Sequence, residues 1–185
     1  MSLALVKSPS QATTLWFTGL SASGKTTLAR ALHERLASQG VHSYVLDGDV
    51  LRAGLCKDLG FSAADRSENI RRVAEVARLM NDAGVVVLCA LISPLQVDRD
   101  AARQIVGAER FFEIHVATPL LVCEQRDPKG LYRRARANQV EQFTGISAPY
   151  EAPQAPALRL DTQEFSVEQA VDQLLTVLAQ PALTS

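Results

Sequence analysis

A glycine-rich segment near the start of the chain carries residue types that bind phosphate. Residues 19–26 read Gly-Leu-Ser-Ala-Ser-Gly-Lys-Thr, which matches the P-loop pattern G-x-x-x-x-G-K-[ST]. Glycines let backbone N–H groups turn inward around an anion, and a helix N-terminus adds partial positive charge. Lys25 can reach the β- and γ-phosphates of a nucleotide, and the Thr26 hydroxyl can ligate Mg²⁺. The segment therefore predicts a site for a nucleoside triphosphate with Mg²⁺.

The residues around this motif favour that interpretation. An apolar run, Leu15–Thr18, precedes it, and a helix-like run from Lys25 to about Gln39 follows it. The alternative, a glycine-rich turn that only joins a strand to a helix, does not require the complete pattern in a strand–loop–helix context. The predicted contacts to the nucleotide are Gly19, Leu20, Ser21, Ala22, Ser23, Gly24, Lys25, Thr26 and Thr27.

The rest of the chain supplies elements that could position this loop. Its 185 residues suit one domain, and strand-like and helix-like runs alternate, which predicts an α/β fold with a parallel sheet. The expected strands are 15–19, 43–46, 85–91, 111–116 and 158–160. The expected helices are 25–39, a short one near 50, one following Ser62, 96–106, 120–125 and 166–178. Residues 1–13 are expected to form a short tail.

Two further features could complete a kinase site. Asp47 and Asp49 follow an expected strand, where they could orient an acceptor hydroxyl or Mg²⁺; alternatively they form a turn or cap a helix. Residues 126–156 are rich in charge and then in proline, and a long irregular stretch beside a phosphate site predicts a lid. Arg126 and Lys129 flank this lid, where they could clamp phosphates when it closes.

Composition excludes some functional classes. The net charge is −1, so no overall basic field attracts nucleic acid, and no apolar run approaches the length that spans a membrane. The first residues do not read as a signal peptide. The three cysteines lack metal-binding spacing and fit reduced thiols, so we expect a cytoplasmic protein.

The type of P-loop protein can be narrowed further. No N-K-x-D sequence is present to read guanine, and the apolar strand 85–91 runs into Ile92-Ser93 rather than into the Asp-Glu pair of motor ATPases. A kinase needs an acceptor pocket and a lid that excludes water. These residues therefore indicate a small-molecule kinase but leave its acceptor open.

Several blocks along the chain resemble the adenylylsulfate kinase family. The match runs from about Thr14 to Asp161. Its blocks are Asp47-Gly48-Asp49, Leu59-Gly60-Phe61-Ser62, Asp65-Arg66-Ser67-Glu68-Asn69, Ile92-Ser93-Pro94, Arg126-Asp127-Pro128-Lys129-Gly130-Leu131-Tyr132, Phe143-Thr144-Gly145-Ile146 and Pro149-Tyr150-Glu151-Ala152-Pro153. The resemblance implies a P-loop NTPase fold with a five-stranded parallel sheet flanked by helices. It also implies phosphoryl transfer from ATP–Mg²⁺ to the 3′-hydroxyl of adenosine 5′-phosphosulfate (APS), with 3′-phosphoadenosine 5′-phosphosulfate (PAPS) and ADP as products.

The resemblance also implies roles for particular residues. Lys25, Asp49 and Ser93 are the implied catalytic positions, with Thr26 and Asp49 near Mg²⁺ and Arg126 on the nucleotide. The implied acceptor contacts are Asp49, Arg52, Phe61, Arg66, Asn69, Ile92, Ser93, Lys129 and Phe143, with the two phenylalanines sandwiching adenine. The family is described with a phosphoserine intermediate at the position of Ser93. Because direct in-line transfer needs no covalent relay, we expect Ser93 to contact acceptor phosphate instead.

The resemblance further implies a homodimer and raises a sulfate adenylyltransferase as a candidate partner. Departures such as Val50, Ala53 and Leu91 leave the phosphate chemistry intact and concern acceptor affinity. Two rival functions remain open at this stage. One is a kinase for another nucleoside or small alcohol, and the other is a non-catalytic nucleotide-binding subunit. The presence of Lys25, Thr26, Asp49 and Ser93 together favours an enzyme.

Overall fold

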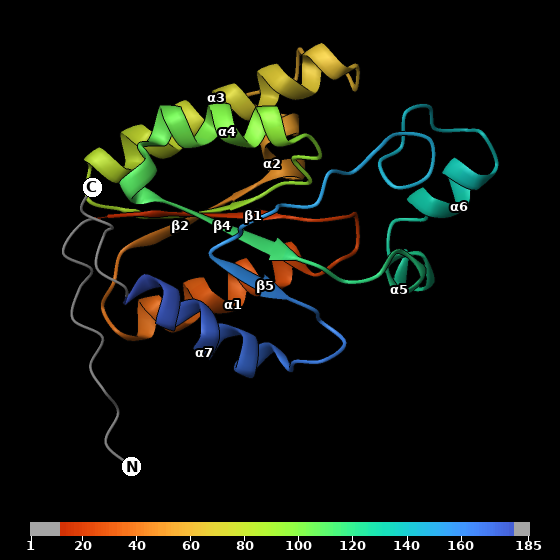
Figure 1. Ribbon diagram of the computed structural model, residues 1–185. Coiled ribbons are helices and arrows are strands. Elements are labelled where there is room, and N and C mark those ends of the chain that lie inside the picture. The colour runs from red at the N-terminus through yellow and green to blue at the C-terminus, as the bar shows by residue number, and fades with distance from the viewer. Residues whose placement is uncertain (1–11, 180–185) are drawn as a thin grey trace.

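The computed structural model describes residues 12–179, which form a parallel α/β fold (Figure 1). The strands are β1 (Thr14–Thr18), β2 (Ser43–Asp47), β3 (Val86–Ala90), β4 (Phe111–Val116) and β5 (Leu158–Leu160). They pair in the order β2-β3-β1-β4-β5, and every pairing is parallel. The predicted five-stranded parallel sheet is therefore confirmed, with strand ends shifted by one residue at most.

Helices cover both faces of this sheet, as Figure 1 shows. One face carries α1 (Lys25–Ser38) and α7 (Val167–Leu178), and the other carries α3 (Ala63–Asp82) and α4 (Gln96–Val106). Each face has its own apolar core, because the strands are buried on both sides. The first core includes Leu32 and Leu174, and the second includes Trp16 and Val73.

Local sequence signals set the helix ends. Ser62 accepts a hydrogen bond from the Asp65 N–H at 3.1 Å and so caps α3, as its sequence predicts. Ser166 and Gln169 form a complete capping box at the start of α7. Gly40 has a φ of 75° just beyond α1, a left-handed conformation that glycine adopts without strain.

The remaining helices are short, and all except a 3₁₀ turn that directly precedes β4 lie near the carboxyl ends of the strands. They are α2 (Gly48–Ala53), the 3₁₀ turn η1 (Ala108–Arg110), α5 (Leu120–Arg126) and α6 (Leu131–Arg136). Helices α5 and α6 project to one side of the sheet (Figure 1). Cys123, Tyr132, Ala135 and Phe143 form a third, smaller core there. The expected lid thus contains a helix and packed side chains.

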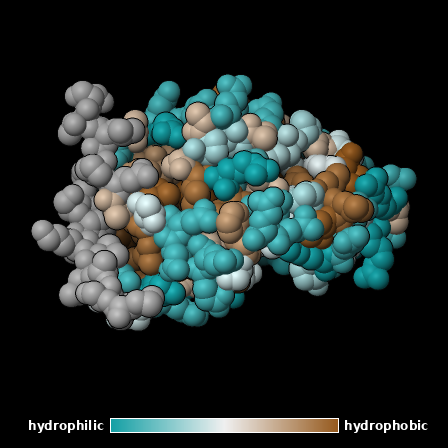
Figure 2. All heavy atoms as spheres, turned by 60° about the horizontal axis from the view of Figure 1, so that its bottom comes forward, coloured by the Kyte–Doolittle hydropathy of each residue, from teal (hydrophilic) through white to brown (hydrophobic). Residues whose placement is uncertain are grey.

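Hydrophilic and apolar residues are unevenly distributed over the surface. Figure 2 shows many hydrophilic residues on the face that carries α1 and α7, with apolar residues visible in two groups, one toward each end of the molecule. None of the helices in residues 12–179 is both long and apolar enough to cross a membrane. The predicted tail spans residues 1–13, of which positions 1–11 lie outside the described residues. Thr13, at its end, is buried.

Candidate nucleotide and acceptor site

The glycine-rich loop joins β1 to α1 at the carboxyl edge of the sheet. Gly19 has a φ of 151°, and a Cβ at this position would lie 2.4 Å from the Val116 carbonyl oxygen. Gly24 precedes α1 with a φ of 107° and offers no side-chain cap. The first N–H groups of α1 therefore remain free to bind an anion, as the motif predicts.

Lys25 is buried and held over this loop. Its Nζ donates hydrogen bonds to the carbonyl oxygens of Gly19 at 2.9 Å and Leu20 at 2.6 Å, and to Ser23 Oγ at 3.3 Å. Burial lowers the pKa of the Lys25 ammonium to about 8, against weaker opposing attraction from Asp47 and Asp49. The loop thus fixes a cation where the terminal phosphates of a nucleotide would lie.

Thr26 and Asp47 form the candidate Mg²⁺ position. Thr26 Oγ1 donates to Asp47 Oδ2 at 2.7 Å, while Asp47 Oδ1 accepts from the backbone N–H groups of Asp49 at 2.9 Å and Val50 at 3.4 Å. Hydroxyl and carboxylate oxygens are the ligands that Mg²⁺ prefers, and it commonly takes one or two carboxylates plus substrate phosphates. Within residues 12–179, no group of three or more His, Cys, Asp or Glu side chains is placed to hold a metal ion by itself. The donor set therefore fits a Mg²⁺ ion that is largely held by nucleotide and water.

Asp49 lies farther out than Asp47. Its side chain is 72% exposed and forms an ion pair with Lys129. The resemblance implies Thr26 and Asp49 near Mg²⁺, whereas the carboxylate that accepts the hydrogen bond of the Thr26 hydroxyl is that of Asp47. Both carboxylates line the same cavity, so Asp47 joins the candidate site residues.

One cavity of about 670 Å³ brings most of the predicted residues together. This volume suits a nucleotide-sized ligand. The predicted residues that line it are Ser21, Ala22, Lys25, Thr26, Asp49, Arg52, Phe61, Arg66, Asn69, Ile92, Ser93, Lys129 and Phe143. The other predicted nucleotide contacts do not line the cavity. They are Gly19, Leu20, Ser23 and Gly24 in the glycine-rich loop, and Thr27, which is exposed on α1.

Phe61 and two arginines form one wall of the cavity. Phe61 is 62% exposed, and the guanidinium carbon of Arg52 lies 4.4 Å from its ring centroid. Arg66 donates to the Phe61 carbonyl oxygen, to Thr144 Oγ1 at 3.0 Å and to the Gln142 carbonyl oxygen at 2.6 Å. This wall presents an aromatic face and positive charge, which suit a base and an anionic group.

Asn69 provides a hydrogen-bond donor that the protein leaves unused. The residue is 4% exposed and lines the cavity, yet its Nδ2 has no partner among the described residues. A buried amide without a partner costs free energy. A ligand acceptor atom in the cavity would remove that cost.

Phe143 lies deeper than its predicted stacking role implies. It is 8% exposed, and its ring meets Tyr132 edge-on with centroids 5.0 Å apart. Phe143 therefore belongs to the small core around α5 and α6 while also lining the cavity. Phe143 therefore contacts both the core of the expected lid and the space that a ligand would occupy.

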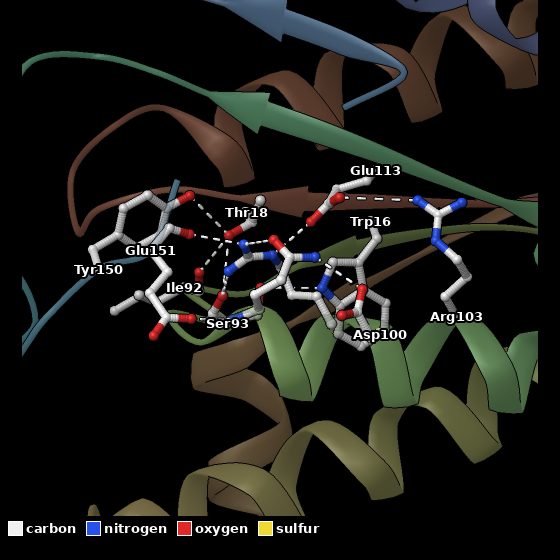
Figure 3. Close-up of polar contacts among 11 residues, drawn as sticks. Trp16, Thr18, Ile92, Ser93, Asp100, Arg103, Glu113, Tyr150 and Glu151 are labelled. Carbon is white, nitrogen blue, oxygen red and sulfur yellow. Dashed lines mark hydrogen bonds and ion pairs between the residues drawn. The ribbon is translucent and has the colours of Figure 1, made fainter. Parts of the chain in front are cut away.

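Ser93 lies in a strained turn after β3. Its φ is 38°, it is 3% exposed, and its Oγ accepts a hydrogen bond from Trp16 Nε1 at 3.0 Å (Figure 3). The hydroxyl is thus engaged by a buried indole. This geometry favours a positional role for Ser93 over that of a covalent relay.

Arg126 contacts Thr162, a residue that touches the glycine-rich loop. It donates to Thr162 Oγ1 at 2.7 Å, and Thr162 in turn donates to the Ser23 carbonyl oxygen at 3.1 Å. The cavity does not include Arg126 among its lining residues. Sequence reasoning did not find Thr162, because no motif marks a threonine that follows the last strand.

Comparisons with known proteins identify the family. Residues 11–161 match the family described as adenylylsulphate kinase. An adenylyl-sulfate kinase of Shewanella amazonensis is 59% identical over 164 residues, which cover 89% of this chain and 83% of that protein. A solved structure of the Mycobacterium tuberculosis APS kinase in complex with AMPPNP and APS is 47% identical, with a TM-score of 0.89. It covers 93% of this chain and 100% of that one.

A hexameric APS kinase from Thiobacillus denitrificans is more distant. It is 36% identical with a TM-score of 0.69, and the match covers 92% of this chain but 29% of that one. The family match extends over most of the present chain, and it includes the glycine-rich loop, both aspartates and the Ser93 turn. This chain belongs to the adenylylsulphate kinase family.

Proposed function

We propose that this protein transfers the γ-phosphoryl group of ATP to the 3′-hydroxyl of APS, which yields PAPS and ADP. The observation that carries the proposal is the single cavity that joins Lys25 and Thr26 to Arg52, Phe61 and Asn69. The first pair suits nucleotide phosphates, and the other three suit an anionic nucleotide acceptor. The names of the relatives support the same reaction.

The donor side stabilises charge on the transferring group. Backbone N–H groups of residues 19–26 and the Lys25 ammonium are fixed before substrate arrives, so little reorganisation is needed during transfer. Mg²⁺, held through Thr26 with Asp47 and Asp49 nearby, would neutralise charge on the β- and γ-phosphates when bound. These groups act mainly by positioning and electrostatics, as a loose transition state requires.

The acceptor side must place a ribose hydroxyl in line with the γ-phosphorus. Asp49 is the carboxylate that can accept the hydroxyl proton or orient that hydroxyl. Phe61 offers a face for adenine, Asn69 a free amide donor, and Arg52 and Arg66 positive charge for the phosphosulfate. Ile92 and Ser93 also line this space.

The segment 126–156 is proposed to act as the lid. Lys129 reaches from this segment across the cavity to Asp49, so it lies between the donor and acceptor sides. Excluding water there would prevent hydrolysis of ATP in place of transfer. Arg126 is proposed to contact the nucleotide from the Thr162 side of the loop.

The assembly and location are also proposed. We expect a homodimer, which sedimentation of the purified protein would test, and a sulfate adenylyltransferase is a candidate partner for co-purification. Cys56, Cys89 and Cys123 are all buried free thiols, which fits the reducing cytoplasm. A labelled fusion protein would check that location.

Product analysis tests the reaction directly. Incubation with ATP, Mg²⁺ and APS should yield PAPS and ADP, and ADP release should require APS. Lys25→Ala should lower kcat by roughly 10²–10³-fold through lost charge stabilisation. The exposed Lys57→Ala variant serves as a matched control. Phosphorylation of another alcohol in preference to APS would favour the rival kinase function, and an absence of any turnover would favour a binding subunit.

A further inference from the structure

Arg99 is a fully buried arginine beside the active-site turn, yet it does not line the cavity. Located on α4, it is 1% exposed. Its guanidinium donates to Glu113 Oε1 at 2.6 Å, to the Ser93 carbonyl oxygen at 2.8 Å and to the Glu151 carbonyl oxygen at 2.7 Å. A fourth hydrogen bond, to Gln96 Oε1 at 2.6 Å, nearly exhausts its donors. Figure 3 shows three of the residues that these contacts join, Ser93, Glu113 and Glu151, in one network of polar contacts.

The turn that Arg99 holds is strained and borders the acceptor space. Ile92, Ser93 and Pro94 line the cavity, and Ser93 has a left-handed φ of 38°. A non-glycine residue keeps such a conformation only when its surroundings impose it. Thr18 adds a second restraint, because its hydroxyl donates to the Ile92 carbonyl oxygen at 2.7 Å.

The same guanidinium secures the end of the predicted lid. The Glu151 N–H donates to the Pro94 carbonyl oxygen at 2.8 Å, and Glu151 Oε2 accepts from the Gln96 N–H at 2.7 Å. The hydroxyls of Tyr150 and Thr18 share a hydrogen bond of 3.0 Å. Residues 150–151 are therefore joined to the turn and to the start of α4 by several hydrogen bonds, one of them from Arg99 to the Glu151 carbonyl oxygen.

Stability alone does not account for this arrangement. The Arg99 and Glu113 side chains are 0% and 5% exposed, and burying two charges carries a desolvation penalty that their attraction often fails to exceed. A planar guanidinium, however, can fix two carbonyl oxygens from different segments at once. Both of those carbonyls belong to segments that border or lead into the acceptor side.

We propose that Arg99 is a positioning residue that sets the acceptor geometry by fixing the Ser93 turn and the Tyr150–Glu151 end of the lid together. It acts through these two segments, without touching substrate. This inference rests on the proposed function, because it concerns the affinity for the phosphoryl acceptor. The donor side, formed by residues 19–26, is held mainly by Lys25 over its own carbonyl oxygens, with one 3.4 Å hydrogen bond from the Gly19 N–H to the Ile92 carbonyl oxygen, so it should depend on Arg99 much less than the acceptor side does.

The first test is Arg99→Lys. Lysine keeps a positive charge against Glu113, so folding should survive, but one ammonium cannot hold both carbonyls in the geometry of the fork. We expect the KM for APS to rise about tenfold or more, since charge-assisted hydrogen bonds are lost. The KM for ATP should stay within about twofold, and kcat should fall less than the KM for APS rises. Calorimetric titration with APS and with ATP should show the same split in Kd.

A second variant removes the charges together. Arg99→Met with Glu113→Gln leaves no lone buried charge, and it should reproduce the selective rise in the KM for APS. The control is Thr14→Val with Asn81→Leu, which removes the buried 2.7 Å hydrogen bond at the opposite end of β1. This control should lower the melting temperature without changing either KM.

The outcomes separate this inference from the proposed function. A wild-type protein that does not phosphorylate APS would contradict the function itself. An active wild type would overturn the Arg99 inference if folded Arg99→Lys kept its KM for APS within about twofold, or if both KM values rose equally. If the double variant does not fold, Arg99→Lys alone decides.

Discussion

The surroundings of Lys25 disfavour its charged form, although that form is the one proposed to bind phosphate. Lys25 is 8% exposed, and its ammonium donates to loop oxygens, because no carboxylate within residues 12–179 forms an ion pair with it. Burial disfavours the charged form, which explains the lowered pKa of about 8. An arriving phosphate would supply the negative charge that this site lacks.

This lowered pKa predicts how nucleotide affinity depends on pH. Below a pH of about 8, Lys25 is already charged in the free protein. Above that pH, Lys25 must take up a proton from solution when ATP binds. The affinity for ATP should therefore fall as pH rises from about 8, by up to about tenfold per pH unit. Calorimetry across this range would measure it.

Lys25→Met supplies the control for that titration. It should bind ATP more weakly, with an affinity that varies little over the same pH range, because no ammonium titrates. A wild-type affinity that stays constant well above pH 8 would contradict the assigned role of Lys25.

Residues in the glycine-rich loop could be predicted from sequence, because their spacing alone defines their geometry. The hydrogen bond between Thr26 and Asp47 could not, since it depends on where β2 ends relative to α1. Both aspartates were candidates, and resemblance favoured Asp49. The structure instead places Asp47 against Thr26, with its second oxygen capping α2.

At the scale of elements, α2 is joined to the phosphate loop through one residue. Asp47 caps this six-residue helix, which carries Asp49 and Arg52, and it also bonds Thr26. The proposed donor and acceptor sides therefore share a carboxylate that caps α2 and that we also propose near Mg²⁺.

Two variants separate those uses. Asp47→Asn keeps an acceptor oxygen for the cap and loses the charge, so the melting temperature should change little. The Mg²⁺ concentration for half-maximal activity should rise by about tenfold, on the order expected for one lost carboxylate ligand. Asp47→Ala should in addition lower stability by about 0.5–2 kcal/mol. Equal Mg²⁺ dependence in wild type and Asp47→Asn would remove Asp47 from the metal site.

The small core around α5 and α6 makes a second prediction at this scale. Phe143→Ala should weaken APS binding more than ATP binding, and it should speed hydrogen exchange in residues 131–147 by opening that core. The exposed Phe61→Ala should weaken APS binding without changing that exchange. If calorimetry showed only ATP affinity changing in Phe143→Ala, the ring would belong to the donor side.

The regular elements were predictable because buried strands and amphipathic helices leave clear periodic patterns. The interior of residues 126–156 was not. Its helix α6 spans six residues with three arginines, too short for a periodic signal. Its order comes from long-range contacts, such as the Tyr132 hydroxyl that donates to the Ser21 carbonyl oxygen at 3.0 Å.

At the scale of the whole molecule, the apolar cores on the two faces of the sheet differ in how many cavity residues their helices carry. The core under α3 and α4 supports Arg66, Asn69 and Arg99, whereas α7 lies on the opposite face and contributes no residue to the cavity. Stability and acceptor affinity should therefore separate between the two faces.

Leu174→Ala tests that separation. Leu174 is fully buried on α7, so its truncation should lower the free energy of unfolding by about 2–5 kcal/mol. Both KM values should match the wild type at a temperature where the variant is folded. Denaturant unfolding and steady-state kinetics would measure these quantities, and a raised KM for APS would show that the faces are coupled.

The place of Trp16 has a practical consequence. It is the chain's single tryptophan, it is shielded from solvent, and its indole N–H meets the hydroxyl of Ser93. Indole emission responds to hydrogen bonding and to nearby charge, so this protein carries an intrinsic fluorophore in contact with a residue that lines the proposed acceptor pocket. Stopped-flow recordings of unlabelled protein could then follow occupancy of that pocket in real time, without any attached dye.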